Sequence, residues 1–135
     1  LEAIKSLNAG QKLVTSNEKL LLQFYTYLGD AYNQSGQHSL SDEHYEKVLK
    51  EEPENTYILN NYAYYLSIRG EKLEKALDLA SKVRQIDPDL LEHLGDILFK
   101  LNEPELAVTY WKKALDAGGE GKFLEKKIKE KKLFE

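Results

Sequence analysis

The sequence predicts an all-α fold, and three observations support that prediction. Apolar residues recur at intervals of three and four, as in Tyr25, Leu28 and Tyr32, and this spacing places them on one face of a helix. The eight glycines and three prolines fall mostly between such segments, where helices end. No apolar–polar alternation over four or more residues stands out, as it would in a half-buried strand.

The stretch from 22 to 55 indicates two amphipathic helices joined by a turn over residues 33–37. Gly29 lies on the inward face of the first helix, where the absence of a Cβ atom allows a partner helix to approach closely. Ser41, which two acidic residues follow, is expected to be the N-cap of the second helix. Pro53 is expected to end that helix.

The same arrangement recurs twice along the chain. In the stretch from 56 to 88, the second helix is expected to carry Ala76, Ala80 and Val83 inward, and Gly70 to end the first helix in a left-handed conformation. In the stretch from 89 to 119, Asn102 is expected to close the first helix and Pro104 to begin the second, around an inward Trp111.

One interval in the third pair is short. Pro88 and Gly95 are seven residues apart, whereas the equivalent pair, Pro53 and Ala63, is ten apart. Either the first helix of this pair begins a turn late, or residues are missing at Leu90–Leu91; we favour missing sequence, because a shortened helix would lose inward contacts.

These pairs resemble the tetratricopeptide repeat, a helix–turn–helix unit of about 34 residues. In the first full unit the resemblance rests on Tyr25, Leu28-Gly29, Tyr32, Tyr45 and Pro53, with Ser41 where the family prefers alanine. It implies a right-handed α-solenoid of stacked antiparallel helix pairs with a C-terminal capping helix. The expected division is the second helix of a partial repeat (1–18), full repeats (22–55 and 56–88), a shortened repeat (89–119) and a capping helix (121–135).

Both ends of the chain depart from the full repeat. Ala3, Leu7 and Gly10 keep the spacing of a second helix, with Thr15 where the closing proline would stand. The alternatives are a fragment of a longer array, whose exposed apolar face would favour self-association, and an N-terminal capping helix. The C-terminal tail carries an apolar stripe of Phe123 or Leu124, Ile128 and Leu133.

The same tail has six lysines and three glutamates from 122 to 135, and we expect the lysines to form a solvated outer face. A nucleic-acid or lipid contact is the alternative. The net charge of −4 argues against nucleic acid as a partner, and no apolar run approaches the roughly 18 residues of a membrane span.

Catalytic and cofactor chemistry is not expected. There is no cysteine, and His38, His44 and His93 belong to no metal-binding motif. Glu92 and Asp96 lie within one helical turn of His93, but the ordinary interpretation is a helix surface. We therefore predict no enzyme activity, no metal and no cofactor.

The resemblance instead implies a protein or peptide partner, bound on the concave face that the first helices line. The groove-facing positions of the family correspond here to Gln23, Thr26, Asp30, Asn33 and Gln34 in the first full unit, Tyr57, Asn60, Tyr64 and Ser67 in the second, and Glu92, Asp96 and Phe99 in the third. The alternative is a homo-oligomerisation or assembly module of a larger cell-envelope protein of this type. For either function the expected compartment is the periplasm or cell envelope, or the cytoplasm, of a bacterium.

One subfamily of these repeats clamps the acidic C-terminal tail of heat-shock chaperones with lysine, arginine and asparagine side chains. At the corresponding positions this sequence has Thr26 and Asp30 in the first unit and Asp89 and His93 in the third, and only Asn61 matches. Because the cations are replaced and an acid is added, we predict that a carboxylate tail is repelled.

Overall fold

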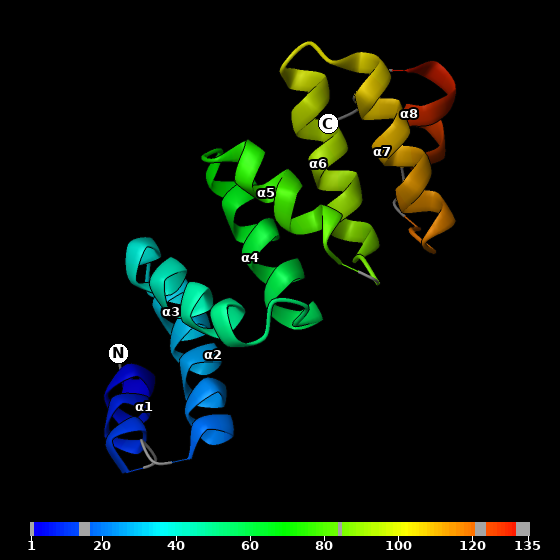
Figure 1. Ribbon diagram of the computed structural model, residues 1–135. Coiled ribbons are helices and arrows are strands. Elements are labelled where there is room, and N and C mark those ends of the chain that lie inside the picture. Colours follow the sequence, from blue (N-terminus) through cyan, green and yellow to red (C-terminus); the bar gives the residue numbers. More distant parts are fainter. Residues whose placement is uncertain (1, 14–16, 84, 121–123, 132–135) are drawn as a thin grey trace. The chain divides into compact units, whose positions relative to one another are not determined.

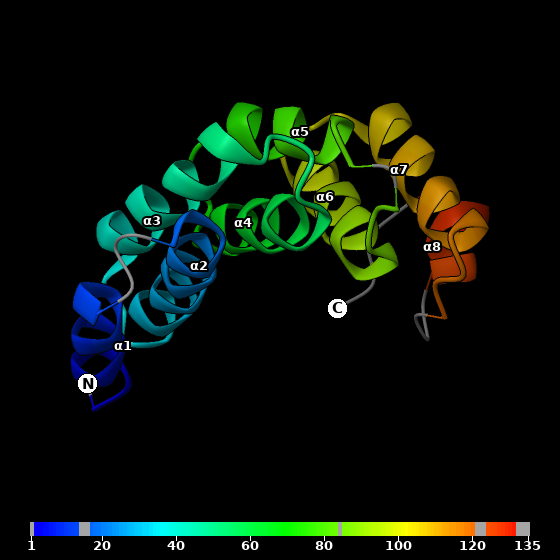
Figure 2. The same ribbon diagram turned by 60° about the horizontal axis from the view of Figure 1, so that its bottom comes forward.

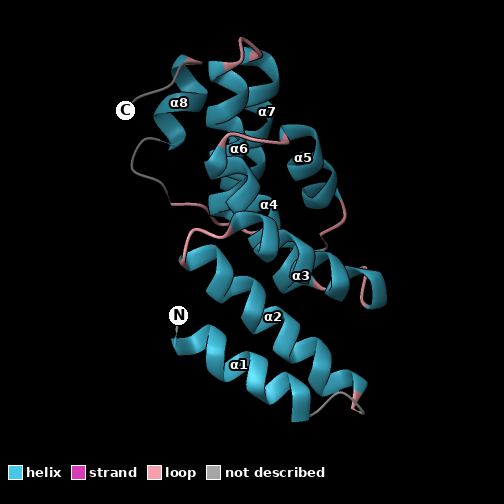
Figure 3. Ribbon diagram, turned by 90° about the vertical axis from the view of Figure 1, so that its left-hand side faces the viewer, coloured by secondary structure: helices cyan, strands magenta, loops and turns pink. Residues whose placement is uncertain are grey.

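The computed structural model describes residues 2–13, 17–83, 85–120 and 124–131 (Figure 1). These residues fold into α-helices connected by turns, and the described part of the chain contains no strand (Figure 3). The prediction of an all-α fold is confirmed. The helices are α1 (Glu2–Leu13), α2 (Glu18–Gln34), α3 (His38–Glu51), α4 (Thr56–Arg69), α5 (Leu73–Ser81), α6 (Pro88–Lys100), α7 (Pro104–Asp116) and α8 (Leu124–Glu130).

The chain divides into two compact units, which we describe separately. The N-terminal unit, Leu1–Ile58, contains α1, α2, α3 and the first residues of α4. The C-terminal unit, Leu59–Glu135, contains the rest of α4 and α5 to α8. Helices that follow one another along the chain pack as pairs within each unit, as α2 and α3 do in the first and α6 and α7 in the second.

Helix α2 is the longest helix of the N-terminal unit. It begins at Glu18 because Asn17 is its N-cap, with the Asn17 Oδ1 atom accepting a hydrogen bond from the Leu20 N–H at 3.0 Å. It ends at Gln34, and Gly36 then adopts a φ of +79°, a value that suits glycine. Because α2 begins at Glu18, it is about one turn longer at its N-terminus than the repeat pattern, which begins at residue 22, predicts.

The prediction that Ser41 caps the next helix is wrong. Helix α3 begins at His38, so Ser41 lies in its first turn and is only 1% exposed. The Ser41 Oγ atom donates a hydrogen bond to the Gly29 carbonyl oxygen of α2 at 2.6 Å. A buried hydroxyl needs a partner, and here that partner comes from the neighbouring helix rather than from the end of its own helix.

Glycines at the helix contacts face aromatic rings of the neighbouring helix. A Cβ atom at Gly29 would lie 2.5 Å from the Tyr45 Cε1 atom, far inside van der Waals contact. In the C-terminal unit, a Cβ atom at Gly95 would lie 2.5 Å from the Trp111 Cδ1 atom. Tyr45 and Trp111 are both fully buried, so each glycine makes room for a core side chain.

Helix α1 packs against α2 by a similar contact, because a Cβ atom at Gly10 would lie 2.4 Å from the Phe24 Cε1 atom. Its apolar residues Ile4 and Leu7 are only partly buried. The closing position predicted at Thr15 lies outside the described residues.

Helix α5 is shorter than the sequence pattern predicts, since it ends at Ser81 and leaves Val83 outside the helix. The Ser81 Oγ atom donates a hydrogen bond to the Asp78 carbonyl oxygen at 2.6 Å, and the Lys82 N–H turns to the Leu79 carbonyl oxygen at 3.1 Å. This local competition for carbonyl oxygens tightens the last turn and ends the helix.

Three other helix ends are as predicted. Gly70 follows α4 with a φ of +70°, and Asn102 follows α6 with a φ of +65°. Pro104 is the first residue of α7, where its missing N–H has no helical partner to lose.

Helix α6 runs without interruption from Pro88, and both residues of Leu90–Leu91 are buried.

The core of the C-terminal unit is formed where α6, α7 and α8 pack side by side (Figure 1 and Figure 2). Its buried members are Leu91, Leu98, Ala107, Val108, Trp111, Ala114 and Leu124. Helix α8 packs against α7, and Leu124 covers the end of this core. The predicted stripe positions Phe123 and Leu133 lie outside the described residues.

The expectation that the lysines of the tail form a solvated face is wrong for one residue, Lys127. It is only 4% exposed, because its side chain turns inward to carboxylates of α6. A buried lysine of this kind is rare unless it is paired with acids.

Candidate functional site

A groove of about 420 Å³ runs along α2 in the N-terminal unit, and we refer to it as the α2 groove. Two tyrosines give it an exposed aromatic surface: Tyr27 is 49% exposed and Tyr57 is 52% exposed. Its lining residues come from α2, from the turn after α3 and from the start of α4. They are Lys19, Leu22, Gln23, Thr26, Tyr27, Glu52, Asn55 and Tyr57.

The helical period of α2 produces one wall of the groove, since Lys19, Gln23 and Thr26 follow one another at intervals of four and three. The Thr26 hydroxyl donates to the Leu22 carbonyl oxygen at 3.1 Å, so its O–H is already used within α2.

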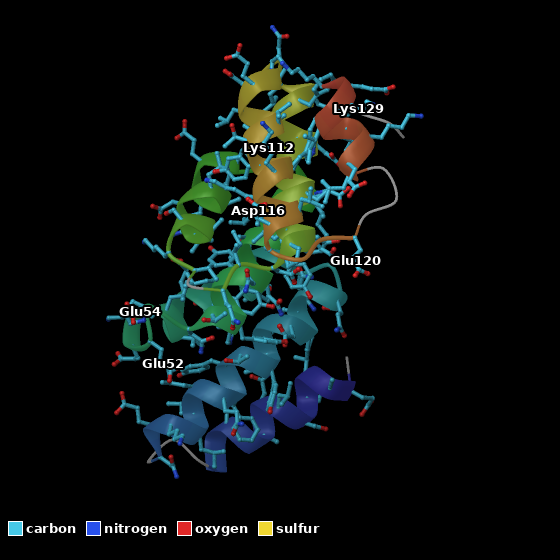
Figure 4. The ribbon with its side chains drawn as sticks, turned by 90° about the vertical axis from the view of Figure 1, so that its right-hand side faces the viewer. Glu52, Glu54, Lys112, Asp116, Glu120 and Lys129 are labelled. Atoms are coloured by element: carbon cyan, nitrogen blue, oxygen red, sulfur yellow. The ribbon has the colours of Figure 1, made fainter. Side chains whose placement is uncertain are left out.

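Another part of the groove lining is a turn that Asn55 holds in place. The Asn55 Oδ1 atom accepts a hydrogen bond from the Ile58 N–H at 3.0 Å and so caps α4. Its Nδ2 atom donates to the Glu52 Oε1 atom at 3.1 Å. Glu52 and Glu54 are labelled in Figure 4, in the turn that follows α3. These local bonds give the turn a defined geometry beside α2.

Asp30 connects the groove to the core of the unit. The Tyr57 hydroxyl donates to the Asp30 Oδ2 atom at 2.7 Å, and the buried Tyr45 hydroxyl donates to the Oδ1 atom. Asp30 was predicted to face a partner. In the structure it orients Tyr57, and its two carboxylate oxygens already accept hydrogen bonds from within the chain.

Asn33 and Gln34, also predicted to face a partner, lie at the far end of α2. The Asn33 Oδ1 atom accepts a hydrogen bond from the His38 Nδ1 atom at 3.2 Å, which joins the two sides of the turn. Gln34 is exposed and lines a separate hollow with Ala3 and Ala31. Neither residue lines the α2 groove.

The predicted residues of α4 have different roles in the C-terminal unit. Asn60 holds the connection to α6, because its Oδ1 atom accepts from the Asp87 N–H at 3.0 Å and its Nδ2 atom donates to the Gln85 carbonyl oxygen at 3.2 Å. Ser67 is buried, and its hydroxyl donates to the Tyr64 carbonyl oxygen at 2.6 Å. Tyr64 itself is 38% exposed.

Glu92 and Asp96, the predicted acidic positions of α6, both contact α8. The Lys127 Nζ atom lies 2.7 Å from the Glu92 Oε2 atom and 2.9 Å from the Asp96 Oδ1 atom. The Trp111 Nε1 atom also donates to the Asp96 Oδ1 atom, at 2.9 Å. These acids therefore take part in an intramolecular cluster at the surface of the core.

The rings of Phe99 and His93, two further residues of α6, contact aromatic rings of other helices. The Phe99 ring stacks on Trp111 with 5.9 Å between ring centroids, and the His93 ring lies 5.6 Å from the Tyr64 ring. Burial lowers the pKa of His93 below its ordinary value, although the charge of Asp96 partly opposes that shift. Within the described part of the chain, the buried His93 Nε2 atom has no hydrogen-bond partner.

Sequence reasoning placed Gln23, Thr26 and Tyr57 in a groove, but it missed the other residues that line it. Lys19 was missed because α2 starts earlier than the repeat pattern. The signal was present, since Asn17 followed by Glu18 is typical of a helix N-terminus. Glu52 and Asn55 belong to a turn, whose side-chain directions do not follow from helical periodicity.

The described residues contain no group of three or more histidine, aspartate or glutamate side chains placed to hold a metal ion. Over the same residues, no helix combines the length and the apolarity that crossing a membrane requires.

The paired helices and the groove define a helical-repeat scaffold, and sequence comparison assigns its family. A family model described as the tetratricopeptide repeat matches residues 3–121. The chain therefore belongs to the tetratricopeptide repeat family, whose domains generally act as protein–protein interaction modules and are typically non-catalytic. A search of curated protein sequences found no match.

Solved structures share the fold. The N-terminal domain of stress-induced protein-1 (STI-1) from C. elegans superposes with a TM-score of 0.64 at 23% identity, covering 82% of this chain and 93% of that one. A structure entitled "Functional Characterization of Pseudomonas Aeruginosa pilF" gives a TM-score of 0.67 at 18% identity, covering 96% of this chain and 68% of that one. At these identities the likeness concerns the fold alone.

Proposed function

We propose that the chain is a non-catalytic scaffold whose α2 groove binds an extended segment of a protein partner. The observation that carries this proposal is the pair of exposed tyrosines, Tyr27 and Tyr57, beside polar side chains in one groove. Tyrosine offers a large contact area with a polar tip and loses little conformational entropy on binding.

The polar residues of the groove suit a peptide backbone. Gln23 carries an amide that can both donate to a peptide carbonyl and accept from a peptide N–H. Lys19 and Glu52 have opposite charges, so the lining residues have no net charge, and Asp30, which contacts Tyr57, adds a negative charge beside them. Its volume of about 420 Å³ falls within the range of ligand pockets, roughly 300–1,000 Å³.

Selection of a random-peptide library on the immobilised chain tests this proposal. We expect selected peptides to bind the wild-type chain and to lose at least about tenfold in affinity, or 1.4 kcal/mol, on Thr26→Arg or Tyr27→Ala chains. Leu106→Ala is the matched control, because Leu106 is 42% exposed on α7 and distant in sequence from the groove. Peptides whose affinity is the same for all three variants would refute the α2 groove as the binding site.

A second candidate function is self-association through α1. The observation that favours it is that Ile4 and Leu7, two apolar residues of α1, are only partly buried. A second copy could cover these side chains and bury more apolar area. Light scattering at increasing concentration tests it: a dimer that Leu7→Lys converts to a monomer supports self-association, and a monomer at all concentrations rules it out.

A further inference from the structure

The contact between α8 and α6 centres on one lysine. The Lys127 Nζ atom lies within hydrogen-bond distance of three carboxylate oxygens: Glu92 Oε2 at 2.7 Å, Asp96 Oδ1 at 2.9 Å and Asp96 Oδ2 at 3.2 Å. The Lys127 side chain is 5% exposed, while those of Glu92 and Asp96 are 21% and 25% exposed. The lysine therefore fills a site that the two acids form.

The electrostatics of this site require a cation. Burial by itself would lower the pKa of Lys127, but hydrogen bonds to Glu92 and Asp96, together with their charges, raise the pKa overall. The ammonium group therefore stays charged. Because two carboxylates face one ammonium, the site would carry two uncompensated negative charges if Lys127 left it.

The geometry favours an ammonium group over a guanidinium group. Three acceptors converge on a single nitrogen, and an ammonium group has three N–H donors on one atom. A guanidinium group has its donors on separate nitrogens of a planar fork, so it can pair with the two oxygens of one carboxylate but cannot direct three N–H groups from one nitrogen to all three oxygens.

Helix α8 is held to the unit by few side chains. It has seven residues, which is too short to form a stable helix in water without tertiary contacts. Leu124 and Lys127 are its buried residues, and Ile128 is partly buried against the core. A helix from another protein with the same three side chains could make the same contacts.

We propose that the face of α6 and α7 around Glu92, Asp96 and Trp111 is a binding site for a lysine-bearing amphipathic helix of a partner protein. Helix α8 occupies this site in cis, and the partner helix binds by replacing it. The partner carries a lysine with an aliphatic residue three positions before it and another directly after it, as Leu124, Lys127 and Ile128 do in α8. This site lies in the C-terminal unit, and the proposal does not depend on the α2 groove.

The charges of Glu92 and Asp96 favour replacement of α8 by another lysine-bearing helix over simple loss of α8. If α8 left alone, water would solvate Glu92 and Asp96, but the repulsion between the two carboxylates would no longer be offset by an ammonium group. A partner without a cation cannot restore that balance, whereas a lysine can. Charge complementarity therefore favours a partner helix that carries a cation at this position.

A labelled peptide with the sequence of residues 119–135 tests the proposal by fluorescence anisotropy. It is titrated into full-length wild-type, Lys127→Ala and Lys129→Ala chains. We expect the Lys127→Ala chain to bind at least tenfold more tightly than the other two, because its own α8 no longer fills the site. Lys129, labelled in Figure 4, is the matched control because it is an exposed lysine on the same helix.

Two further variants keep the result decisive. If Lys127→Ala does not fold, Lys127→Arg keeps the charge with a poorer fit, and we expect it to bind the peptide with intermediate affinity. A peptide in which alanine replaces the lysine equivalent to Lys127 should bind at least tenfold more weakly to both the Lys127→Ala chain and the Lys127→Arg chain. In the Lys127→Ala chain, Trp111, the single tryptophan, should change its emission on binding because it borders the site that the peptide lysine then fills.

Equal peptide affinity for the Lys127→Ala and Lys129→Ala chains would overturn the proposal. Equal affinity for the peptides with and without the lysine would also overturn it. So would equal affinity of the peptide for chains with and without Asp96→Asn. A wild-type chain that dimerises by exchanging α8, seen by light scattering, would assign the site to a second copy and also overturn the partner helix.

Discussion

Gly29 of α2 lies directly against the ring of Tyr45 of α3. A Cβ atom at position 29 would lie 2.5 Å from the Tyr45 Cε1 atom and 2.6 Å from its Cδ1 atom. The ring cannot move aside easily, because it is fully buried and its hydroxyl donates to Asp30. The distance between the two helices therefore depends on the absence of a side chain at this one position.

Replacing Gly29 with leucine should destabilise the N-terminal unit. Overpacking in a close-packed core typically costs about 1–3 kcal/mol, and the helix propensity gained over glycine offsets only about 1 kcal/mol. We expect Gly29→Leu to lower the urea midpoint followed by circular dichroism. Gln23→Leu adds a similar side chain at an exposed position of α2 and should change the midpoint much less. Equal midpoints for the two variants would contradict this packing.

Trp111→Ala should have a larger effect in the C-terminal unit. Trp111 is fully buried, and removing a buried tryptophan side chain costs about 3–5 kcal/mol. It also removes the indole N–H that donates to Asp96. Thermal melts should show a loss of many degrees, whereas Leu115→Ala, at a position 38% exposed, should change the melt little. An unchanged melt for Trp111→Ala would exclude Trp111 as the centre of the core.

The sequence predicted those parts of the fold that depend on local chemistry. Gly70 and Asn102 have positive φ values at helix ends, and Pro104 begins a helix, because each residue type suits that backbone conformation. Gly29 and Trp111 were also placed correctly, since helical spacing determines which side of a helix faces inward.

The features that sequence reasoning missed depend on partners distant along the chain. Ser41 has the composition of an N-cap, yet its hydroxyl bonds to a carbonyl of another helix. Lys127 has the composition of a solvated surface, yet α6 offers it two carboxylates. In both cases the residue type allows two environments, and only the packing of helices decides between them.

The same reasoning explains the partial prediction of the site. Gln23, Thr26 and Tyr57 follow helical registers and line the α2 groove. Asp30 follows the same register, but it accepts hydrogen bonds from two tyrosines, which its position in the sequence does not reveal. The binding role of these residues stays a prediction that peptide selection tests.

His44 should make the N-terminal unit sensitive to acid. It is 7% exposed, and its ring packs near Tyr32 with 5.2 Å between ring centroids. Burial lowers its pKa below the ordinary value, against the opposing effect of its hydrogen bond to the Leu40 carbonyl oxygen; the charge of Lys47 also lowers the pKa and that of Glu43 raises it.

The lowered pKa of His44 determines how the stability of the N-terminal unit changes with pH. The unfolded chain binds a proton at His44 near its ordinary pKa of about 6.5, and the folded chain does so only at lower pH. Stability is therefore complete above about pH 6.5 and falls as the pH decreases through the pKa of the folded state. Urea midpoints at about pH 7.5 and about pH 5.5 should differ, and His44→Gln should reduce the difference.

His93 serves as a comparison, because burial lowers its pKa as well. Its contribution should persist in the His44→Gln chain, since it lies in the C-terminal unit. A midpoint that does not change with pH in the wild-type chain would contradict both assignments.

A peptide ending in Glu-Glu-Val-Asp, the acidic tail type that one subfamily of these repeats clamps, should not bind this chain. Thr26 stands where that subfamily has lysine, and Asp30 where it has asparagine. Asp30 is held in place by the Tyr57 hydroxyl at 2.7 Å, so its negative charge cannot easily turn away from an approaching carboxylate. Titration at low ionic strength should show no saturable binding, and the same peptide with an amidated C-terminus should behave identically. Micromolar binding that salt abolishes and amidation weakens would mean that cations elsewhere in the chain compensate for Asp30, and our account of the groove charges would then be wrong.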